Sequence, residues 1–218
     1  MAAVAGLRPL TGGSCHWRRF RPADHRNMPW KNGLGTTAEI AIDPPGADIA
    51  GGRFRWRLSI ASIDRSCPFS AFPGYERTIM VISGNGMVLT VAGRPARRMD
   101  RLFDPFMFSG DEPADCQLID GPIRDFNLVV DRARSGARTA VEVLGPTPRE
   151  RQLGGEVCLV HCLSGEAMVG VGAREPTERL ELGDTLLVRT GELDRDSRTL
   201  SLIGVKNAVA TVIELHNH

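Results

Sequence analysis

The chain has 218 residues and a net charge of +1, with 42% hydrophobic and 24% charged residues, which is the composition of an ordinary globular protein. Its length is sufficient to bury a good core, in one large domain or two small ones. The near-zero charge argues against nucleic acid or an anionic membrane surface as partners, and no apolar run approaches the ~20 residues that a membrane span requires.

Residues 1–13 are predicted to form a loose tail. Arg8 and Pro9 interrupt their weak apolar stretch, and no charged segment precedes it, so the pattern does not predict a secretory signal. The chain has five cysteines, an odd number, and their spacing matches neither a disulfide framework nor a zinc motif. We therefore expect a protein of the reducing cytoplasm.

The stretch 28–40, with the sequence MPWKNGLGTTAEI, combines an aromatic, basic and amide side chain with two glycines. Lys31 is one of only two lysines among 27 basic residues, and it stands beside Asn32. The glycines formally fit the dinucleotide-binding pattern, but that pattern has meaning only between a strand and a helix, and here an alternating strand follows it. A tight turn and a close approach to a ligand both remain open for this loop.

After this loop, short β-rich runs alternate with Gly, Pro, Asp and Asn, which is typical of a sandwich or barrel. The segment 54–62 alternates, with its large apolar residues on one face. The segment 78–91 contains two apolar runs joined by Asn85-Gly86, a strong hairpin signal. Helical periodicity is scarce throughout, so the sequence predicts an all-β fold.

The chain also contains an internal repeat, which predicts two copies of one β unit. Similar segments recur in the same order: 81–88 with 162–169, 105–112 with 186–193, and 121–130 with 204–213. Each copy has the size of a small double-sheet jelly roll. We expect a first barrel over 14–132 and a second, degenerate barrel over 139–218, joined by a polar stretch near 131–140.

The two copies differ in polarity. Asp125 and Asn127 of the first copy correspond to Ala208 and Ala210 of the second, and Arg77 corresponds to Cys158. A polar functional site is therefore expected in the first barrel only.

Metal and nucleophilic chemistry find little support in the sequence. The segment 53–132 contains no histidine, and the five histidines of the chain are His16, His25, His161, His216 and His218. The Gly-x-Ser-x-Gly elbow of the hydrolases is also missing. We expect no metal and no other cofactor, while a pair of carboxylates acting as acid and base stays open.

Two cations and two amides around one pocket would suit a small carboxylate-bearing molecule, which an arginine can grip bidentately. Aromatic residues near position 70 would supply an apolar wall, unless they only seal the mouth of the barrel. Glu39 and Asp125 would orient the cations or accept an N–H of the ligand. The predicted ligand-binding residues are Trp30, Lys31, Asn32, Thr37, Glu39, Arg57, Phe72, Arg77, Asp125 and Asn127.

Four segments resemble the HutD/Ves family, in order and with similar spacing: MPWKNGLGTTAEI, WRLSIASI, PFSAFPGYERTIMVISGNGMVL and DGPIRDFNLVVDR. The resemblance covers about residues 28–132 strongly and the second half weakly. It implies a bicupin that lacks the cupin metal-binding histidines, with HutD members associated with histidine utilisation and Ves members with cold or stress responses. It brings no established catalytic activity. Cys67 and Glu76 replace a frequent Gly and Asp of the family, so the pocket dimensions are expected to differ.

Together these features predict a bicupin, two jelly-roll-like barrels from an internal duplication, that binds an anionic metabolite of amino-acid catabolism in a regulatory or sequestering role. A metal-independent isomerase or hydrolase using Glu39 or Asp125 as general base is the first alternative. A protein-interaction module is the second. A homodimer is compatible with all three hypotheses.

Overall fold

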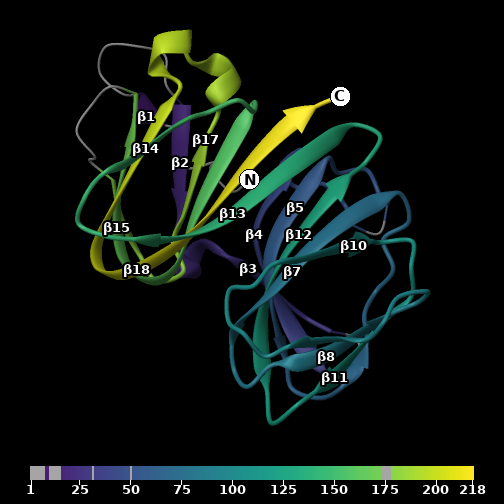
Figure 1. The fold of residues 1–218 in the computed structure, drawn as a ribbon. Coiled ribbons are helices and arrows are strands. Elements are labelled where there is room, and N and C mark those ends of the chain that lie inside the picture. Colours follow the sequence, from purple (N-terminus) through teal and green to yellow (C-terminus); the bar gives the residue numbers. More distant parts are fainter. Residues whose placement is uncertain (1–7, 10–15, 31, 50, 173–177) are drawn as a thin grey trace. The chain divides into compact units, whose positions relative to one another are not determined.

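The structure is a computed structural model that describes residues 8–9, 16–30, 32–49, 51–172 and 178–218. The described residues form two compact units, one of those within Asp24–Gly136 together with His218, and one of those within 1–23 and 137–217. Both are built almost entirely from strands (Figure 1). Of the predicted tail, only Arg8–Pro9 are described, and they form the short strand β1.

The Asp24–Gly136 unit is a sandwich of two antiparallel sheets. The larger has the order β10-β7-β12-β5-β4-β3 and the smaller the order β6-β11-β8-β9. The larger sheet consists of β3 (Arg26–Pro29), β4 (Gly35–Asp43), β5 (Trp56–Ile63), β7 (Tyr75–Ser83), β10 (Phe106–Ser109) and β12 (Ile123–Asp131). The smaller sheet consists of β6 (Cys67–Pro68), β8 (Met87–Val91), β9 (Arg97–Met99) and β11 (Ala114–Leu118).

Apolar side chains of both sheets fill one end of this sandwich. Ile63, Ile79 and Val81 of the larger sheet belong to the same buried cluster as Met87 and Leu89 of the smaller one. Packing between the inner faces of two sheets is what holds a jelly roll together. The two sheets remain separate, so the predicted barrel is a jelly-roll sandwich and not one closed sheet.

The other unit has its described strands in one eight-stranded sheet with the order β1-β2-β17-β15-β18-β13, in which β14 also pairs with β18 and β16 with β15. Its strands are β1, β2 (His16–Phe20), β13 (Ser135–Leu144), β14 (Arg149–Gln152), β15 (Val157–Val171), β16 (Glu178–Glu181), β17 (Thr185–Val188) and β18 (Thr199–Asn217). The long strands β15 and β18 carry register shifts between Cys162 and Ala167, which bend the sheet around an apolar core. Three short 3₁₀ turns complete the described elements: η1 (Pro22–Asp24), η2 (Thr190–Glu192) and η3 (Arg195–Ser197).

The predicted duplication is confirmed at the two central strand pairs. β12 lies beside β7 in one unit, and the corresponding β18 lies beside β15 in the other. Asn127 pairs with Ile79, whereas its counterpart Ala210 pairs with Cys162 and not with Val160. A shift of two residues leaves every side chain on its original face, because side chains alternate with a period of two.

Strand β2 departs from the predicted domain boundary at residue 14. It pairs with β17, so that Trp17 lies opposite Val188 and Phe20 opposite Thr185. Figure 1 shows this purple strand among the green and yellow strands of the C-terminal half. Sequence order placed it with the first barrel, but the structure gives it to the second.

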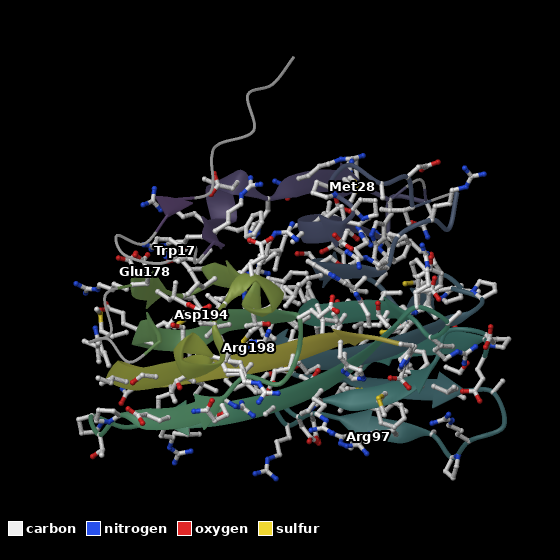
Figure 2. All side chains as sticks on the ribbon, turned by 90° about the horizontal axis from the view of Figure 1, so that it is seen from above. Trp17, Met28, Arg97, Glu178, Asp194 and Arg198 are labelled. Atoms are coloured by element: carbon white, nitrogen blue, oxygen red, sulfur yellow. The ribbon has the colours of Figure 1, made fainter. Side chains whose placement is uncertain are left out.

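Arg94, Arg97 and Arg98 form ion pairs within their own unit. Arg94 pairs with Glu112, and Arg97, labelled in Figure 2, pairs with Asp104. These pairs are exposed, and exposed ion pairs contribute little to stability. No helix among the described residues is long and apolar enough to cross a membrane.

Candidate functional site

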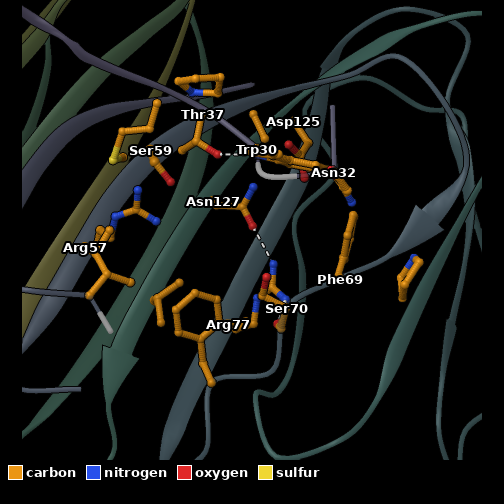
Figure 3. A pocket seen from close by; sticks show the side chains of 17 residues that line it. Trp30, Asn32, Thr37, Arg57, Ser59, Phe69, Ser70, Arg77, Asp125 and Asn127 are labelled. Atoms are coloured by element: carbon orange, nitrogen blue, oxygen red, sulfur yellow. Dashed lines mark hydrogen bonds between the residues drawn. The ribbon is translucent and has the colours of Figure 1, made fainter. Parts of the chain in front are cut away.

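A cavity of about 470 Å³ lies against the inner face of the larger sheet in the Asp24–Gly136 unit (Figure 3). Most of its polar lining comes from alternate residues of the neighbouring strands β7, β12 and β5, which share one face; Thr37 of β4 and the loop residues Asn32 and Ser70 complete it. The complete lining is Met28, Pro29, Trp30, Asn32, Thr37, Ile49, Arg57, Ser59, Ala61, Pro68, Phe69, Ser70, Phe72, Arg77, Asp125, Asn127 and Val129.

Strand register places the two arginines of the cavity on opposite sides of β12. Val129 pairs with Arg57 on β5 and with Arg77 on β7. Neighbouring strands are about 4.8 Å apart, so the two backbones are separated by about 10 Å. The cavity floor thus carries a guanidinium on each side, with Asn127 one alternation away on the strand between them.

Arg57 is half of a buried ion pair. Its Nε donates to Oε2 of Glu39 at 2.8 Å, and both side chains are more than nine-tenths buried. Glu39 comes from β4, at the position where a bulge shifts the register with β5. Glu39 was predicted to bind the ligand, but the structure places it behind Arg57 and outside the cavity lining.

Arg77 is buried in a different environment. Its Nη1 donates to the Ser70 carbonyl at 3.1 Å and its Nη2 to Oδ1 of Asn127 at 2.9 Å, while Nε has no hydrogen-bond partner among the described residues. The guanidinium carbon lies over the rings of Phe69, Phe72 and Phe108, at 5.2, 5.4 and 5.1 Å from their centroids. Burial lowers the pKa of Arg77 to about 10, so the group remains a cation at neutral pH. No carboxylate of the described residues lies within ion-pair distance of it.

Asp125 is the deepest charged residue of the cavity, with 1% of its surface exposed. Burial raises the pKa of its carboxyl to about 6, against the opposing effects of a hydrogen bond from the Asn127 side chain and the nearby charge of Arg77. Its Oδ1 has no hydrogen-bond partner among the described residues. Asn127 therefore bridges a cation and a carboxyl, because its oxygen accepts from Arg77 and its amide nitrogen donates to Asp125.

The glycine-rich loop closes on itself and also lines the cavity. The amide of Trp30 donates to the Gly35 carbonyl, and Nε1 of Trp30 donates to Oγ1 of Thr37 at 2.8 Å. Oδ1 of Asn32 accepts from the amide of Leu34, which makes an Asx turn. The expected tight turn is therefore present, and Trp30, Asn32 and Thr37 also border the cavity, while approach to a ligand stays a prediction. Lys31 lies outside the described residues.

The aromatic segment contributes two rings to the cavity and one to its support. Phe69 and Phe72 line it, whereas Tyr75 stacks on Phe54 with ring centroids 4.5 Å apart. The Tyr75 hydroxyl lies 2.8 Å from the Gly52 carbonyl and 3.0 Å from that of Phe54. Two of the three aromatic side chains therefore line the cavity as an apolar wall. Tyr75 instead holds the loop that precedes β5.

Comparison with known proteins assigns the chain to a family. The HutD family model matches residues 22–204. The chain belongs to the HutD family. An uncharacterised 21.2 kDa protein in the hutC 3′ region of Pseudomonas putida is 43% identical over 167 residues, which cover 77% of this chain and 84% of the relative. Protein Ves of Cronobacter sakazakii is 36% identical over 122 residues, covering 54% of this chain and 64% of Ves.

Two solved structures share both fold and sequence with this HutD family member. A conserved protein of unknown function from Pseudomonas aeruginosa PAO1 superimposes with a TM-score of 0.81 at 33% identity, covering 92% of this chain and 99% of the other. HutD from Pseudomonas fluorescens SBW25 superimposes with a TM-score of 0.77 at 37% identity, covering 93% and 99%. The predicted family and the cupin-like, all-β fold are both confirmed.

Nine residues that line the cavity of this HutD family member are not among the predicted ligand-binding residues: Met28, Pro29, Ile49, Ser59, Ala61, Pro68, Phe69, Ser70 and Val129. Ser59 and Ala61 had a signal, since they alternate with Arg57 on one strand. That strand is buried on both faces, so the pattern did not say which face was the inner one. For Ile49, which reaches the cavity from a loop, nothing in the sequence pointed to the site.

The second unit of the HutD fold lacks this polar constellation. Cys158, Ala208 and Ala210, the counterparts of Arg77, Asp125 and Asn127, are fully buried members of its apolar core. The described residues of the whole chain contain no cluster of three or more His, Cys, Asp or Glu side chains suited to a metal ion.

Proposed function

We propose that the cavity binds a small molecule carrying a carboxylate, and that the protein acts in histidine utilisation by sensing or sequestering such a metabolite. The observation that carries the proposal is Arg77. It is a cation with 6% of its surface exposed, it borders the cavity, and among the described residues it has no carboxylate at ion-pair distance.

Physical chemistry favours an anionic partner for such a group. A buried charge is costly unless it is compensated, and a guanidinium is well matched to a planar carboxylate. The rings of Phe69 and Phe72 supply an apolar surface beside it, and small-molecule sites usually combine such walls with few polar groups. The cavity volume of about 470 Å³ falls within the range of about 300–1,000 Å³ that is usual for these sites.

The metabolic setting rests on family membership. The relative from P. putida is encoded in the hutC 3′ region, and the similar structure from P. fluorescens is named HutD. These names support a role beside the genes of histidine degradation. The intermediates of that pathway carry carboxylates, which is the chemistry that the cavity favours.

A thermal-shift screen against urocanate, formylglutamate, formiminoglutamate, glutamate and histidine tests the proposal. A ligand at about 100 times its dissociation constant stabilises the fold by about 2.7 kcal/mol, which gives a clear shift. Arg77→Lys should weaken binding of the hit at least about tenfold, because it keeps the charge but loses the planar fork. Arg98→Lys, the same exchange at an exposed position, is the matched control. If none of the five compounds shifts the melting temperature, the proposal is wrong.

Lys31 enters the proposal from sequence alone, as a second cation for the ligand. Lys31→Ala should then lower affinity for the same compound without changing the melting temperature of the free protein. Equal affinities of this variant and the wild type would remove Lys31 from the site and leave the role of Arg77 in place.

A second candidate function is acid–base catalysis, favoured by the pKa of about 6 at Asp125, which lies close to a working pH. Glu39 does not fit the role of general base, because Arg57 engages its carboxylate. Turnover of a bound metabolite that Asp125→Asn abolishes, with binding retained, would establish an enzyme. Binding without turnover in the wild type would contradict it.

A further inference from the structure

The charges around the cavity divide into one compensated pair and one open pair. Arg57 and Glu39 are in contact at 2.8 Å and cancel each other. Arg77 and Asp125 are not in contact, and Asn127 lies between them. The net charge that the described lining presents to a ligand is therefore decided by the protonation state of Asp125.

The neighbours of Asp125 on other strands hold no second described charge that would fix this state. Arg77 on β7 favours the ionised carboxylate. On the side of the smaller sheet, Cys67 of β6 and Cys116 of β11 have raised pKa values, mainly through burial and in part through the charge of Asp125. These thiols are neutral at physiological pH. On β5, Ala61 contributes only a backbone hydrogen bond to Asp125.

The hydrogen bonds around Asp125 leave one carboxyl oxygen without a described partner, so that this oxygen can carry a proton. The Asn127 side chain and the backbone at Ala61 donate to the carboxyl group, yet Oδ1 has no partner among the described residues. An ionised carboxylate with an unpartnered, fully buried oxygen is poorly solvated, and protonation of that oxygen relieves the cost. The orientation of Asn127 is held by Arg77, whose Nη2 donates to the Asn127 oxygen at 2.9 Å.

We propose that Asp125 determines the charge selectivity of the cavity, so that binding of a carboxylate is accompanied by uptake of one proton from solvent at Asp125. The proposal rests on the function proposed above and adds the condition under which the site accepts an anion. With Asp125 ionised, its charge offsets Arg77 and repels an incoming carboxylate. With Asp125 neutral, the charge of Arg77 is unopposed among the described lining residues.

Because the pKa of Asp125 is close to neutral, the gain or loss of its proton affects ligand binding at neutral pH. A carboxyl with a pKa of about 6 is largely ionised at pH 7, and a second negative charge nearby raises its pKa further. By linkage, the ligand then binds more tightly as the pH falls. The protein would report the metabolite together with the acidity of its surroundings.

Calorimetric titration with formylglutamate between pH 5.5 and pH 8 tests the proposal, since this probe titrates only at its carboxyl groups, below that range. The dissociation constant of the wild type should rise above pH 6 by up to about tenfold per pH unit, the slope for one coupled proton. Titration at pH 7 in two buffers of different ionisation enthalpy should show uptake of about one proton per ligand. Asp125→Asn, which is always neutral, should bind with little pH dependence and no proton uptake. Asp64→Asn, the same exchange at an exposed position, should behave like the wild type.

A second measurement does not depend on the variant folding. The carboxyl carbon resonance of Asp125 in the wild type should titrate at a higher pH when formylglutamate is bound than when it is absent. Binding with the same affinity across the range and without proton uptake would overturn the selectivity of Asp125, while the proposed carboxylate site would stand. If neither formylglutamate nor any other of the five compounds bound to the wild type or to Asp125→Asn at any pH, the carboxylate site itself would be removed and this proposal with it.

Discussion

At the scale of single residues, Arg57 and Arg77 show how similar side chains in one cavity come to different electrostatic states. Arg57 is neutralised by Glu39 at 2.8 Å, whereas Arg77 rests on three aromatic rings and hydrogen bonds to neutral oxygens. The first arrangement stabilises the folded protein through a pair that must be kept whole. The second keeps a cation available at the cost of its desolvation.

Removing one member of the buried Glu39–Arg57 ion pair should therefore lower the free energy of unfolding strongly. Glu39→Gln leaves the charge of Arg57 buried without a counter-charge, and we expect a loss of about 3–5 kcal/mol in the free energy of unfolding. Replacing both residues by methionine should cost much less than the sum of the two single replacements, because no charge is left unpaired. Urea denaturation of the wild type, Glu39→Met, Arg57→Met and the double variant measures this coupling. Asp104→Asn, which breaks an exposed pair with Arg97, should cost no more than about 1 kcal/mol.

Additive losses in the Glu39–Arg57 cycle would mean that the two side chains do not interact as the structure has them.

Asp125 should make the stability of the free protein depend on pH in a distinctive way. Its folded-state pKa of about 6 lies above the unfolded value of about 3.9, so the folded state binds the extra proton. Its contribution is fully present below pH 4 and is lost as the pH rises through 6. Asp125→Asn should accordingly gain stability relative to the wild type between pH 4 and pH 7, by up to about 3 kcal/mol. Denaturation at pH 4.5, 5.5, 6.5 and 7.5 gives the difference, and a constant difference would contradict the assignment.

Much of the candidate site could be found at the residue scale because the two copies could be compared. Arg77, Asp125 and Asn127 stood out as polar residues whose counterparts are Cys or Ala, and all three line the cavity. Glu39 was placed with them, since a sequence does not tell a carboxylate facing a cavity from one facing an arginine. Its position behind Arg57 depends on the bulge in β4, for which the sequence carried no sign.

At the scale of elements, the turn between β3 and β4 depends on close approach of the backbone to an aromatic ring and to a neighbouring strand. A Cβ at Gly35 would lie 2.4 Å from the carbonyl oxygen of Ser62 and 3.2 Å from the ring of Trp30. Gly33, two residues earlier, has a φ of +69° but open space around it. Gly35 is therefore needed because there is no space for a Cβ, and Gly33 is needed because its backbone is left-handed.

Replacing these two glycines by alanine should separate the two requirements. Gly33→Ala should cost about 1–2 kcal/mol, the usual penalty of a left-handed conformation for a residue with a Cβ. Gly35→Ala should cost more, because the clash is with the backbone of β5, and it should also displace Trp30 from the cavity. Trp30 fluorescence and denaturation midpoints measure both effects. A smaller loss for Gly35→Ala than for Gly33→Ala would show that the turn is looser than the structure has it.

The elements themselves were predictable wherever apolar and polar residues alternate, but their partners and faces were not. The strand at 56–63 is buried on both faces, so its pattern did not predict which face carries Arg57 and Ser59 or whether that face lines the cavity. For β2, no strand was predicted from the sequence. Its pairing with β17, more than 160 residues away, is fixed by tertiary packing, which local pattern does not encode.

At the scale of the whole molecule, duplication followed by divergence has left two units that share a central strand pair but differ in their interiors. The unit Asp24–Gly136 carries charged and amide groups on the inner face of its larger sheet. In the other unit, side chains such as Val160, Leu186 and Val212 form an apolar core around the corresponding positions. The repeat was predictable because strand and turn patterns survive divergence better than the residues of a site.

This asymmetry predicts one binding site per chain. The counterparts Cys158, Ala208 and Ala210 are fully buried among apolar side chains, so the second unit offers no cation to a carboxylate at these positions. Titration of the purified protein with whichever metabolite gives the thermal shift should therefore yield a stoichiometry of one ligand per chain. Placing a carboxyl group in the second interior with Ala208→Asp should not create a second site, and it should destabilise the protein by several kcal/mol, because the charge has no partner there. A stoichiometry of two for the wild type would mean that the second unit binds ligand through groups other than the counterparts of Arg77, Asp125 and Asn127.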